Sequence, residues 1–160
     1  MVYLPLALDR AQALRAGEPL DRVPAHAATP SLRLALALAA EQEEGDFAAL
    51  SAAGVAALDG LTGSRRLVLA ADVGADQVSD AGGDSGEVGV ERLSWSQVQA
   101  LFADEEAAGP AVTAAAGAAR DVALEQAYDL PAVVALTDDH DLLWFSPAEL
   151  DGLDGLDGLA

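Results

Sequence analysis

The chain contains no cysteine and no lysine, and aromatic residues make up only 4% of it. Without cysteine the protein cannot form disulfides, zinc–thiolate sites or thiol nucleophiles. Without lysine a Walker-type phosphate loop cannot form, and the glycine motifs of dinucleotide-binding proteins and of serine hydrolases are missing as well. Because aromatic rings are scarce, a core must consist mainly of Leu, Val and Ala. These absences exclude the common nucleotide-binding and hydrolase signatures.

Long apolar runs are also missing. The longest apolar-rich stretch, from Leu34 to Ala40, is far shorter than the roughly 20 residues that a membrane-spanning helix needs. The first residues, MVYLPLALDR, have no basic stretch before the apolar run and do not resemble a signal peptide. We therefore expect a soluble, cytoplasmic protein, and the lack of cysteine fits a reducing compartment.

The charge is strongly negative. The net charge is −19, the isoelectric point is near 4.1, and all 8 basic residues are arginine. Such a surface repels nucleic-acid backbones and anionic membranes, so we expect neither as a partner. The partners that remain are a protein with a basic surface, a second copy of the chain, or divalent cations.

Hydrophobic patterning predicts an alternation of strands and helices. The expected strands cover residues 2–6, 22–28, 65–73, 87–93 and 142–145, the expected helices cover 9–16, 31–40, 47–58 and 111–128, and residues 98–104 could form either. This order predicts an α/β or α+β domain over residues 1–150, with a single mixed sheet of about 4–6 strands and packed helices. Residues 41–46 are expected to form a polar break, and residues 74–86 a loop.

Local signals refine this prediction. Pro5 cannot donate a ladder hydrogen bond, so its strand either lies at an edge or ends there. Asp9 and Thr29 are expected to cap helices, and the pair Thr29-Pro30 is typical of a helix start. Phe47 opens the helical repeat of its segment and is expected on the buried face. The apolar run at 65–73 predicts a central strand that is covered on both faces.

The C-terminal end combines an aromatic strand with a repeat. Trp144 is expected to be a core anchor or a rare contact surface, and the segment SPAE that follows has the capping-box pattern of a helix start. The last residues, 151–160, repeat Asp-Gly-Leu three times. We expect a flexible acidic tail there, with a leucine-bearing segment that folds onto a partner as the alternative.

Two clusters could carry chemistry. Asp138, Asp139, His140 and Asp141 offer hard oxygen ligands and one imidazole, which suit a divalent cation. Neighbouring residues of a strand point to opposite faces, so at most two of the four could share one metal ion unless a turn wraps around it. A solvated polar turn is therefore the competing interpretation to a metal site at Asp139, His140 and Asp141.

The second cluster is the pair Arg65-Arg66, which could hold a phosphate or carboxylate; neutralisation of the acidic surface is the competing interpretation. His26 is expected to be partly buried with one satisfied ring nitrogen. We expect no cofactor, with a divalent cation as the one open option.

Several segments together resemble an uncharacterised family of small actinobacterial proteins. The resembling pieces are VYLPL at 2–6, AHAATPSLR at 25–33, EGDFAALSAAGVAAL at 44–58, RRLVLAADV at 65–73 and DHDLLWF at 139–145. They are similar to the domain of unknown function DUF6912. The resemblance implies one domain up to about Leu150 in an actinobacterial cytoplasm, and it implies no activity.

Three functions remain open at this point. The first is a non-enzymatic module that binds a protein partner or supports an assembly, which the lack of catalytic and cofactor motifs favours. The second is a metal-dependent enzyme acting on a small anionic substrate, with Asp139, His140 and Asp141 near the site and Arg65 or Arg66 as the anion clamp. The third is an acidic decoy that occupies a basic protein.

Overall fold

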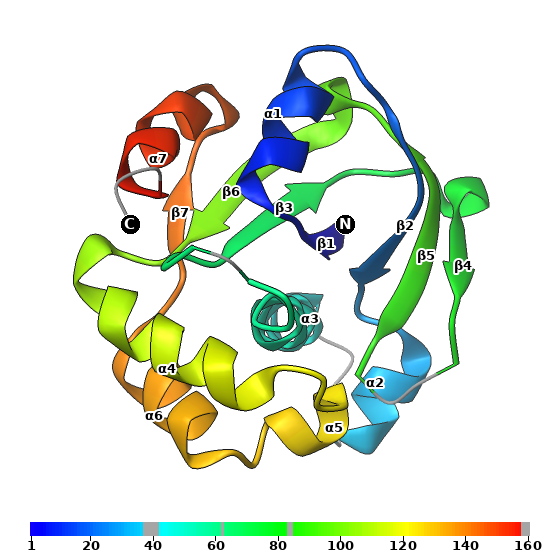
Figure 1. The fold of residues 1–160 in the computed structure, drawn as a ribbon. Coiled ribbons are helices and arrows are strands. Elements are labelled where there is room, and N and C mark those ends of the chain that lie inside the picture. The colour runs from blue at the N-terminus through cyan, green and yellow to red at the C-terminus, as the bar shows by residue number, and fades with distance from the viewer. Residues whose placement is uncertain (37–41, 62, 83–84, 158–160) are drawn as a thin grey trace.

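The computed structural model describes residues 1–36, 42–61, 63–82 and 85–157. Its strands form one sheet in the order β4-β5-β2-β1-β3-β6-β7 (Figure 1). The strands are β1 Val2–Pro5, β2 Leu20–His26, β3 Leu67–Ala71, β4 Val78–Asp80, β5 Glu87–Leu93, β6 Val98–Ala103 and β7 Leu143–Phe145.

All neighbouring strands of this sheet run antiparallel. The predicted mixed sheet of about 4–6 strands is therefore wrong in two respects, since the sheet is antiparallel and has 7 strands. The chain has the α+β architecture, the second of the two predicted classes.

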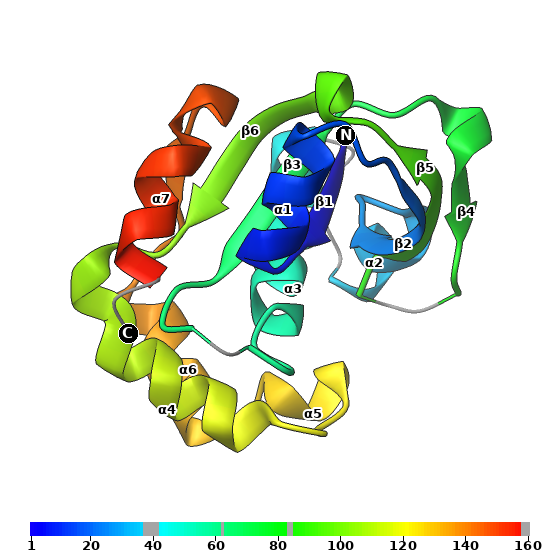
Figure 2. The same cartoon turned by 45° about the horizontal axis from the view of Figure 1, so that its top comes forward.

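Helices lie on both faces of the sheet (Figures 1 and 2). They are α1 Leu8–Arg15, α2 Pro30–Ala35, α3 Gln42–Ala56, α4 Gly109–Ala119, α5 Leu124–Ala127, α6 Pro131–Asp139 and α7 Leu150–Asp157, with 3-10 turns at Ala75–Gln77, Trp95–Gln97, Glu106–Ala108 and Pro147–Glu149. Helices α1 and α7 cover one face, and α3 covers the other. Helices α4, α5 and α6 pack beyond α3, which lies between them and the sheet in Figure 1. No helix of the described chain is long and apolar enough to cross a membrane.

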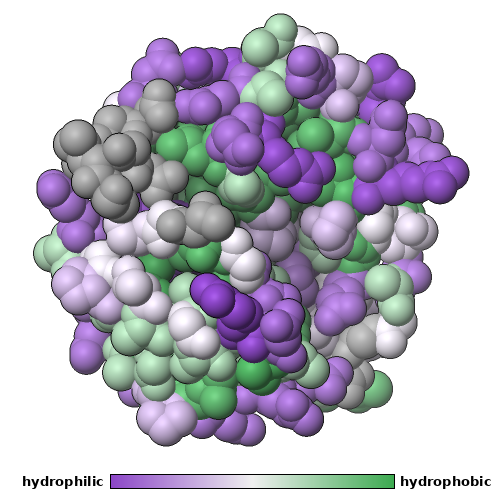
Figure 3. All heavy atoms as spheres, viewed as in Figure 1, coloured by the Kyte–Doolittle hydropathy of each residue, from purple (hydrophilic) through white to green (hydrophobic). Residues whose placement is uncertain are grey.

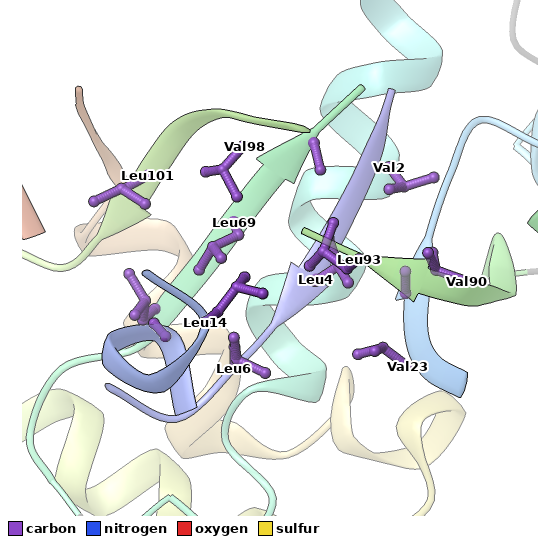
Figure 4. Packing of buried hydrophobic residues seen from close by; sticks show 14 of the residues in the cluster. Val2, Leu4, Leu6, Leu14, Val23, Leu69, Val90, Leu93, Val98 and Leu101 are labelled. Atoms are coloured by element: carbon purple, nitrogen blue, oxygen red, sulfur yellow. The ribbon is translucent and has the colours of Figure 1, made fainter. Parts of the chain in front are cut away.

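Three buried clusters hold these layers together. The largest lies between the sheet and α1 and includes Leu4, Leu14, Leu69 and Leu101 (Figure 4). A second cluster joins α3 to the face of the sheet opposite α1. A third cluster joins the C-terminal end of α3 to α4, α5 and α6. The clusters are built almost entirely from Leu, Val and Ala, as the shortage of aromatic residues predicts. Outside them, the face shown in Figure 3 is mostly hydrophilic, with smaller hydrophobic patches.

The central strand is the best sequence prediction. Every residue of β3 is buried, and the strand pairs with β1 on one side and β6 on the other. Strand β1 is also internal, and Pro5 is its last residue, so the predicted end of the strand is right and the edge position is wrong. Strand β5 has the predicted bounds, and β2 begins two residues before the predicted strand, at Leu20.

The helix starts agree with the sequence in one case and differ in another. The Thr29 hydroxyl accepts a hydrogen bond from the Leu32 backbone N–H at 3.2 Å, so α2 begins as predicted. The predicted helix at 31–40 is confirmed as far as Ala35, and residues 37–41 lie outside the described residues. Helix α1 has Ala7 at its N-cap, and Asp9 lies in its first turn, where a carboxylate also stabilises the helix dipole.

Helix α3 starts earlier than predicted, and its Phe47 side chain lies on the exposed face of the helix. It begins at Gln42, because Gln and Glu are good helix formers and extend the helix through the expected polar break. Its buried residues include Ala49, Ala52 and Ala53, whose small side chains let the helix approach the sheet closely. Phe47 is on the opposite side with 69% of its surface exposed, so its predicted burial is wrong.

The predicted helix at 111–128 is two helices with a break between them. Arg120 leaves the helical conformation with ψ at 125°, and Asp121 is left-handed with φ at 59°. The Asp121 N–H donates to the Asp59 carboxylate at 3.1 Å, a tertiary contact that compensates the break. The sequence prediction also missed α6, although Pro131 at its first turn is a typical start signal.

The remaining strands include one that was not predicted. Strand β4 lies within the expected loop at 74–86, and its three residues pair with the predicted strand β5. The open segment at 98–104 is strand β6, which pairs with β3 and β7. The two capping boxes are present: the Ser94 N–H donates to Gln97 Oε1 at 2.9 Å, and the Ser146 N–H donates to Glu149 Oε2 at 2.6 Å.

The Asp-Gly-Leu repeat is folded over its first part. Helix α7 spans Leu150–Asp157, and both Leu150 and Leu153 belong to the main buried cluster. The segment 151–160, expected to be a flexible acidic tail, is therefore helical as far as Asp157, because leucines three residues apart lie on one helical face and reach the core. Residues 158–160 lie outside the described residues.

Replacement of Gly152 by alanine tests this helix. Position 152 is within α7, and a Cβ there would meet nothing within 4 Å. We expect Gly152→Ala to raise the free energy of unfolding by about 0.5–1 kcal/mol in urea denaturation. The matched control is Gly60→Ala: this site is equally open, but its φ of 76° makes alanine destabilising. An unchanged stability for Gly152→Ala would mean that residue 152 is not helical.

Candidate functional site

Two adjoining cavities run along α3, with volumes of about 890 and 490 Å³. Both are lined by Phe47, Ser51 and Tyr128, so they form one continuous hollow, which we call the α3 cleft. Most lining residues come from in or beside α2, α3, α5 and α6, and others from the segments that precede β3, β5 and β7. Helices α2, α3 and α5 lie near one another in Figure 1.

The wider half of the α3 cleft is mainly apolar. It is lined by Leu32 and Ala35 of α2, by Leu36 directly after this helix, by Phe47 and Ala48 of α3, and by Tyr128 after α5. Leu36 is 53% exposed and Phe47 69% exposed, so large apolar side chains face solvent here. Among the described residues, two carboxylates, Glu44 and Glu125, line this half.

The narrower half is more polar. Thr137, His140 and Asp141 line it, together with the guanidinium of Arg66. Gly54 forms part of its floor, where a Cβ would lie 3.3 Å from Arg66 Nη1 and 3.1 Å from Leu142 Cδ1. A glycine inside a helix costs about 1 kcal/mol relative to alanine, and here it makes room for the guanidinium.

Arg66 forms a buried ion pair with Asp104. Arg66 Nε lies 2.9 Å from Asp104 Oδ2 and Nη2 lies 2.7 Å from Oδ1, while the Arg66 backbone N–H also donates to Oδ2 at 2.9 Å. The two side chains are 3% and 0% exposed. The pairing follows from the register of the sheet, because Leu67 of β3 is opposite Ala103 of β6. Arg66 directly precedes Leu67 and Asp104 directly follows Ala103, so the antiparallel strands bring the two residues together.

Arg65, the neighbour of Arg66, is also bonded to Asp104. Its Nε donates to the Asp104 carbonyl oxygen at 2.7 Å, and its guanidinium carbon lies 6.0 Å from the centre of the Phe145 ring. The structure thus gives both arginines of the predicted anion site bonds to Asp104. The role of Arg65 and Arg66 in anion binding stays a prediction.

The acidic cluster near His140 is arranged differently from the predicted polar turn. Asp138 and Asp139 are the last residues of α6, and His140 is its C-cap, with its N–H donating to the Leu136 carbonyl at 2.9 Å. His140 Nδ1 lies 3.1 Å from Glu105 Oε1. His26, the other histidine, is 5% exposed with Nδ1 3.0 Å from the Ser85 carbonyl oxygen, as expected.

The metal site at Asp139, His140 and Asp141 stays a prediction. Within the described part of the chain, no group of three or more His, Asp and Glu side chains is placed so that it could hold a metal ion. His140 and Glu105 are two such side chains in contact, and a metal site needs further ligands beside them.

The charge of the α3 cleft is negative. Its charged lining residues are Glu44, Glu125, Asp141 and Arg66, and Arg66 is neutralised by Asp104. Asp129 and Asp138, which are exposed, follow the lining residues Tyr128 and Thr137 directly in the chain. A negative cleft disfavours an anionic ligand and favours a neutral or cationic one.

Both tyrosines of the chain titrate at high pH. Burial raises the pKa of Tyr128, beside the α3 cleft, to about 12; burial and the nearby Asp46 carboxylate raise the pKa of Tyr3 to about 12. We therefore expect the tyrosinate absorbance to appear near pH 12 in the folded protein and near pH 10 in urea. Since the folded pKa values lie above the unfolded ones, the tyrosines' contribution to stability is complete below about pH 10 and is lost as the pH rises towards 12.

Ultraviolet titration of the folded chain and of Tyr128→Phe checks this expectation. The variant should lose about half of the signal near pH 12 and keep the remainder, because the chain has 2 tyrosines. A folded-state midpoint near pH 10 in the unchanged protein would contradict the raised pKa values of the two tyrosines.

Sequence reasoning missed most of the α3 cleft. Phe47 was expected in the core, and Ser51 and Tyr128 carried no motif. One usable signal was Gly54, since a glycine within an alanine-rich helix indicates a close approach by another group. Many of the remaining lining residues come from in or beside α2, α5 and α6, which are distant from α3 in the sequence.

Comparisons with known proteins give one match. A family model described as "Family of unknown function (DUF6912)" matches residues 1–153. The match covers the whole sheet and extends into α7. Neither the curated proteins nor the solved structures contain a match to the chain.

Proposed function

Because the chain belongs to the DUF6912 family of unknown function, its family brings no activity with it, and we propose that it is a non-enzymatic protein-binding module. In this proposal the α3 cleft holds an apolar segment of a partner protein. The observation that carries it is the exposure of Phe47 and Leu36, at 69% and 53%, in the lining of a cavity of about 890 Å³. Exposed apolar surface around a hollow is typical of an interaction site.

The charge of the chain supports a basic partner and not a second copy. Two chains with a net charge of −19 each repel one another, which disfavours self-association. A basic protein is attracted by the same field, and its association is faster at low ionic strength. The acidic decoy is the limiting case in which charge alone accounts for binding. The apolar walls of the α3 cleft favour a partner that also buries a hydrophobic segment.

A photo-crosslinking experiment tests this proposal. A photoreactive phenylalanine analogue is placed at position 47 of the full chain. A second variant of the same chain carries the analogue at position 34 instead. Leu34 is the matched control, because it lies in α2 with 84% exposure and does not line the α3 cleft. We expect a defined adduct with one partner protein from position 47 and none from position 34.

The same partner must depend on the Phe47 side chain. We expect Phe47→Ala to weaken binding of the purified partner at least about tenfold, while Leu34→Ala leaves it unchanged. Both variants should change the free energy of unfolding by less than about 0.5 kcal/mol, because each side chain is exposed. Equal adducts from both positions, or no adduct from position 47, would contradict the proposed function.

A further inference from the structure

We propose that the segment held in the α3 cleft is a basic amphipathic helix of about three turns. This inference rests on the proposed function and adds the conformation and charge of the bound segment. It depends on three features of the cleft: the stripe of α3 that forms its floor, the helical walls, and the carboxylates around it.

The floor sets the length of the segment. Glu44, Phe47, Ser51 and Gly54 of α3 line the cleft at spacings of three and four residues, so they lie along one face of the helix. From residue 44 to residue 54 an α-helix rises about 15 Å, at 1.5 Å per residue. A second helix lying along this stripe would match it over about three turns.

The walls set the conformation of the segment. They are formed mainly by α2, α5 and α6, whose backbone groups are largely bonded within each helix. An extended peptide in such a place would bury backbone N–H and C=O groups without partners, which costs free energy. A helix satisfies its own backbone bonds and presents only side chains, as in other helix-in-groove complexes.

The surrounding charges set the composition of the segment. Glu44 and Glu125 line the wide half, Asp141 lines the narrow half, and Arg66 in the lining is paired with Asp104. Glu44, Glu125 and Asp141 are all exposed. The bound helix should therefore bury an apolar face against Phe47 and carry Arg or Lys on its flanks, where these carboxylates can reach them.

Three synthetic peptides of about four turns test the inference with the full chain. The first has a leucine face and arginine flanks, the second has the same leucine face with glutamate flanks, and the third is the first peptide with two central prolines. We expect the first to bind in fluorescence anisotropy, and the other two to bind at least about tenfold more weakly, because each loses one of the proposed features.

Matched variants separate the cleft from the general acidity of the chain. Glu44→Gln with Glu125→Gln removes two carboxylates of the cleft, and Glu18→Gln with Glu91→Gln removes two exposed carboxylates that do not line it. We expect the first pair, and also Phe47→Ala, to weaken the arginine peptide at least about fivefold. The second pair should change its binding by less than about twofold.

The outcomes distinguish this inference from the proposed function. If the arginine and glutamate peptides bind equally, or the proline peptide binds as well as its parent, the inference is wrong. The crosslink at position 47 then still decides whether the cleft binds a protein. Equal weakening by both glutamine pairs, or no effect of Phe47→Ala, also overturns the inference, since binding would then follow net charge. If no peptide binds, the inference is wrong as well.

Discussion

Replacement of Asp104 by alanine is expected to lower the free energy of unfolding by about 3–5 kcal/mol. Asp104 has no exposed surface, and it accepts three hydrogen bonds from Arg66 through its carboxylate. Without this carboxylate the Arg66 guanidinium, which is 3% exposed, would keep its charge in a buried site with no counter-ion. Urea denaturation of the variant and of the unchanged chain measures the difference.

An exposed ion pair provides the control. Arg92 and Asp21 are 3.7 Å apart with more than half of each side chain exposed, so Asp21→Ala should change the stability by less than about 1 kcal/mol. The double variant Arg66→Met with Asp104→Leu removes both buried charges and should recover most of the loss, because apolar groups can replace a buried pair at little cost. A loss below about 1 kcal/mol for Asp104→Ala would contradict the role of the pair in holding β3 and β6.

Replacement of Leu69 by alanine is the second large effect, an expected loss of about 2–5 kcal/mol. Leu69 lies in the central strand β3, has no exposed surface, and packs in the largest buried cluster. Removing its side chain leaves a cavity in a layer that is closed by the sheet and α1 (Figure 4). The loss has two parts: the hydrophobic transfer energy of the removed atoms and the cost of the cavity.

The comparison with Leu143 makes this prediction specific. Leu143 lies in the edge strand β7 and is 43% exposed, so the same substitution should cost about 1 kcal/mol or less. The ratio of the two losses in unfolding free energy compares a residue of the central strand with a residue of the edge strand. Similar losses for Leu69→Ala and Leu143→Ala would contradict the placement of β3 in the centre and β7 at the edge.

Trp144 shows why the sequence alone could not distinguish a central strand from an edge strand. It is one of 2 tryptophans in the chain, and it was expected to be either a core anchor or a contact surface. The structure places it in β7, paired with Phe102 of β6 and 61% exposed, which supports the second alternative. Alternation along the strand predicts that neighbours point to opposite faces, but it does not show that Trp144 lies in an edge strand, where most of its side chain is exposed.

Local signals were sufficient for much of the secondary structure. The apolar run of β3, the alternation of β5, and the caps at Thr29, Ser94 and Ser146 depend on residues within a few positions of one another. The local signals failed where a distant contact decides the outcome. The break at Asp121 is compensated by Asp59, and β4 forms because β5 offers an edge to pair with.

The sequence by itself determined the chemistry that is missing, the acidic charge, the aliphatic core and most of the helices and strands, because these follow from composition and from contacts between near neighbours. The tertiary structure alone decided the antiparallel order of the sheet, the pairing of Arg66 with Asp104, and the α3 cleft. Each of these depends on residues that lie far apart in the chain and meet only when the layers pack. Strand register brings Arg66 to Asp104, and the alanine face of α3 packs on the sheet and leaves Phe47 facing solvent.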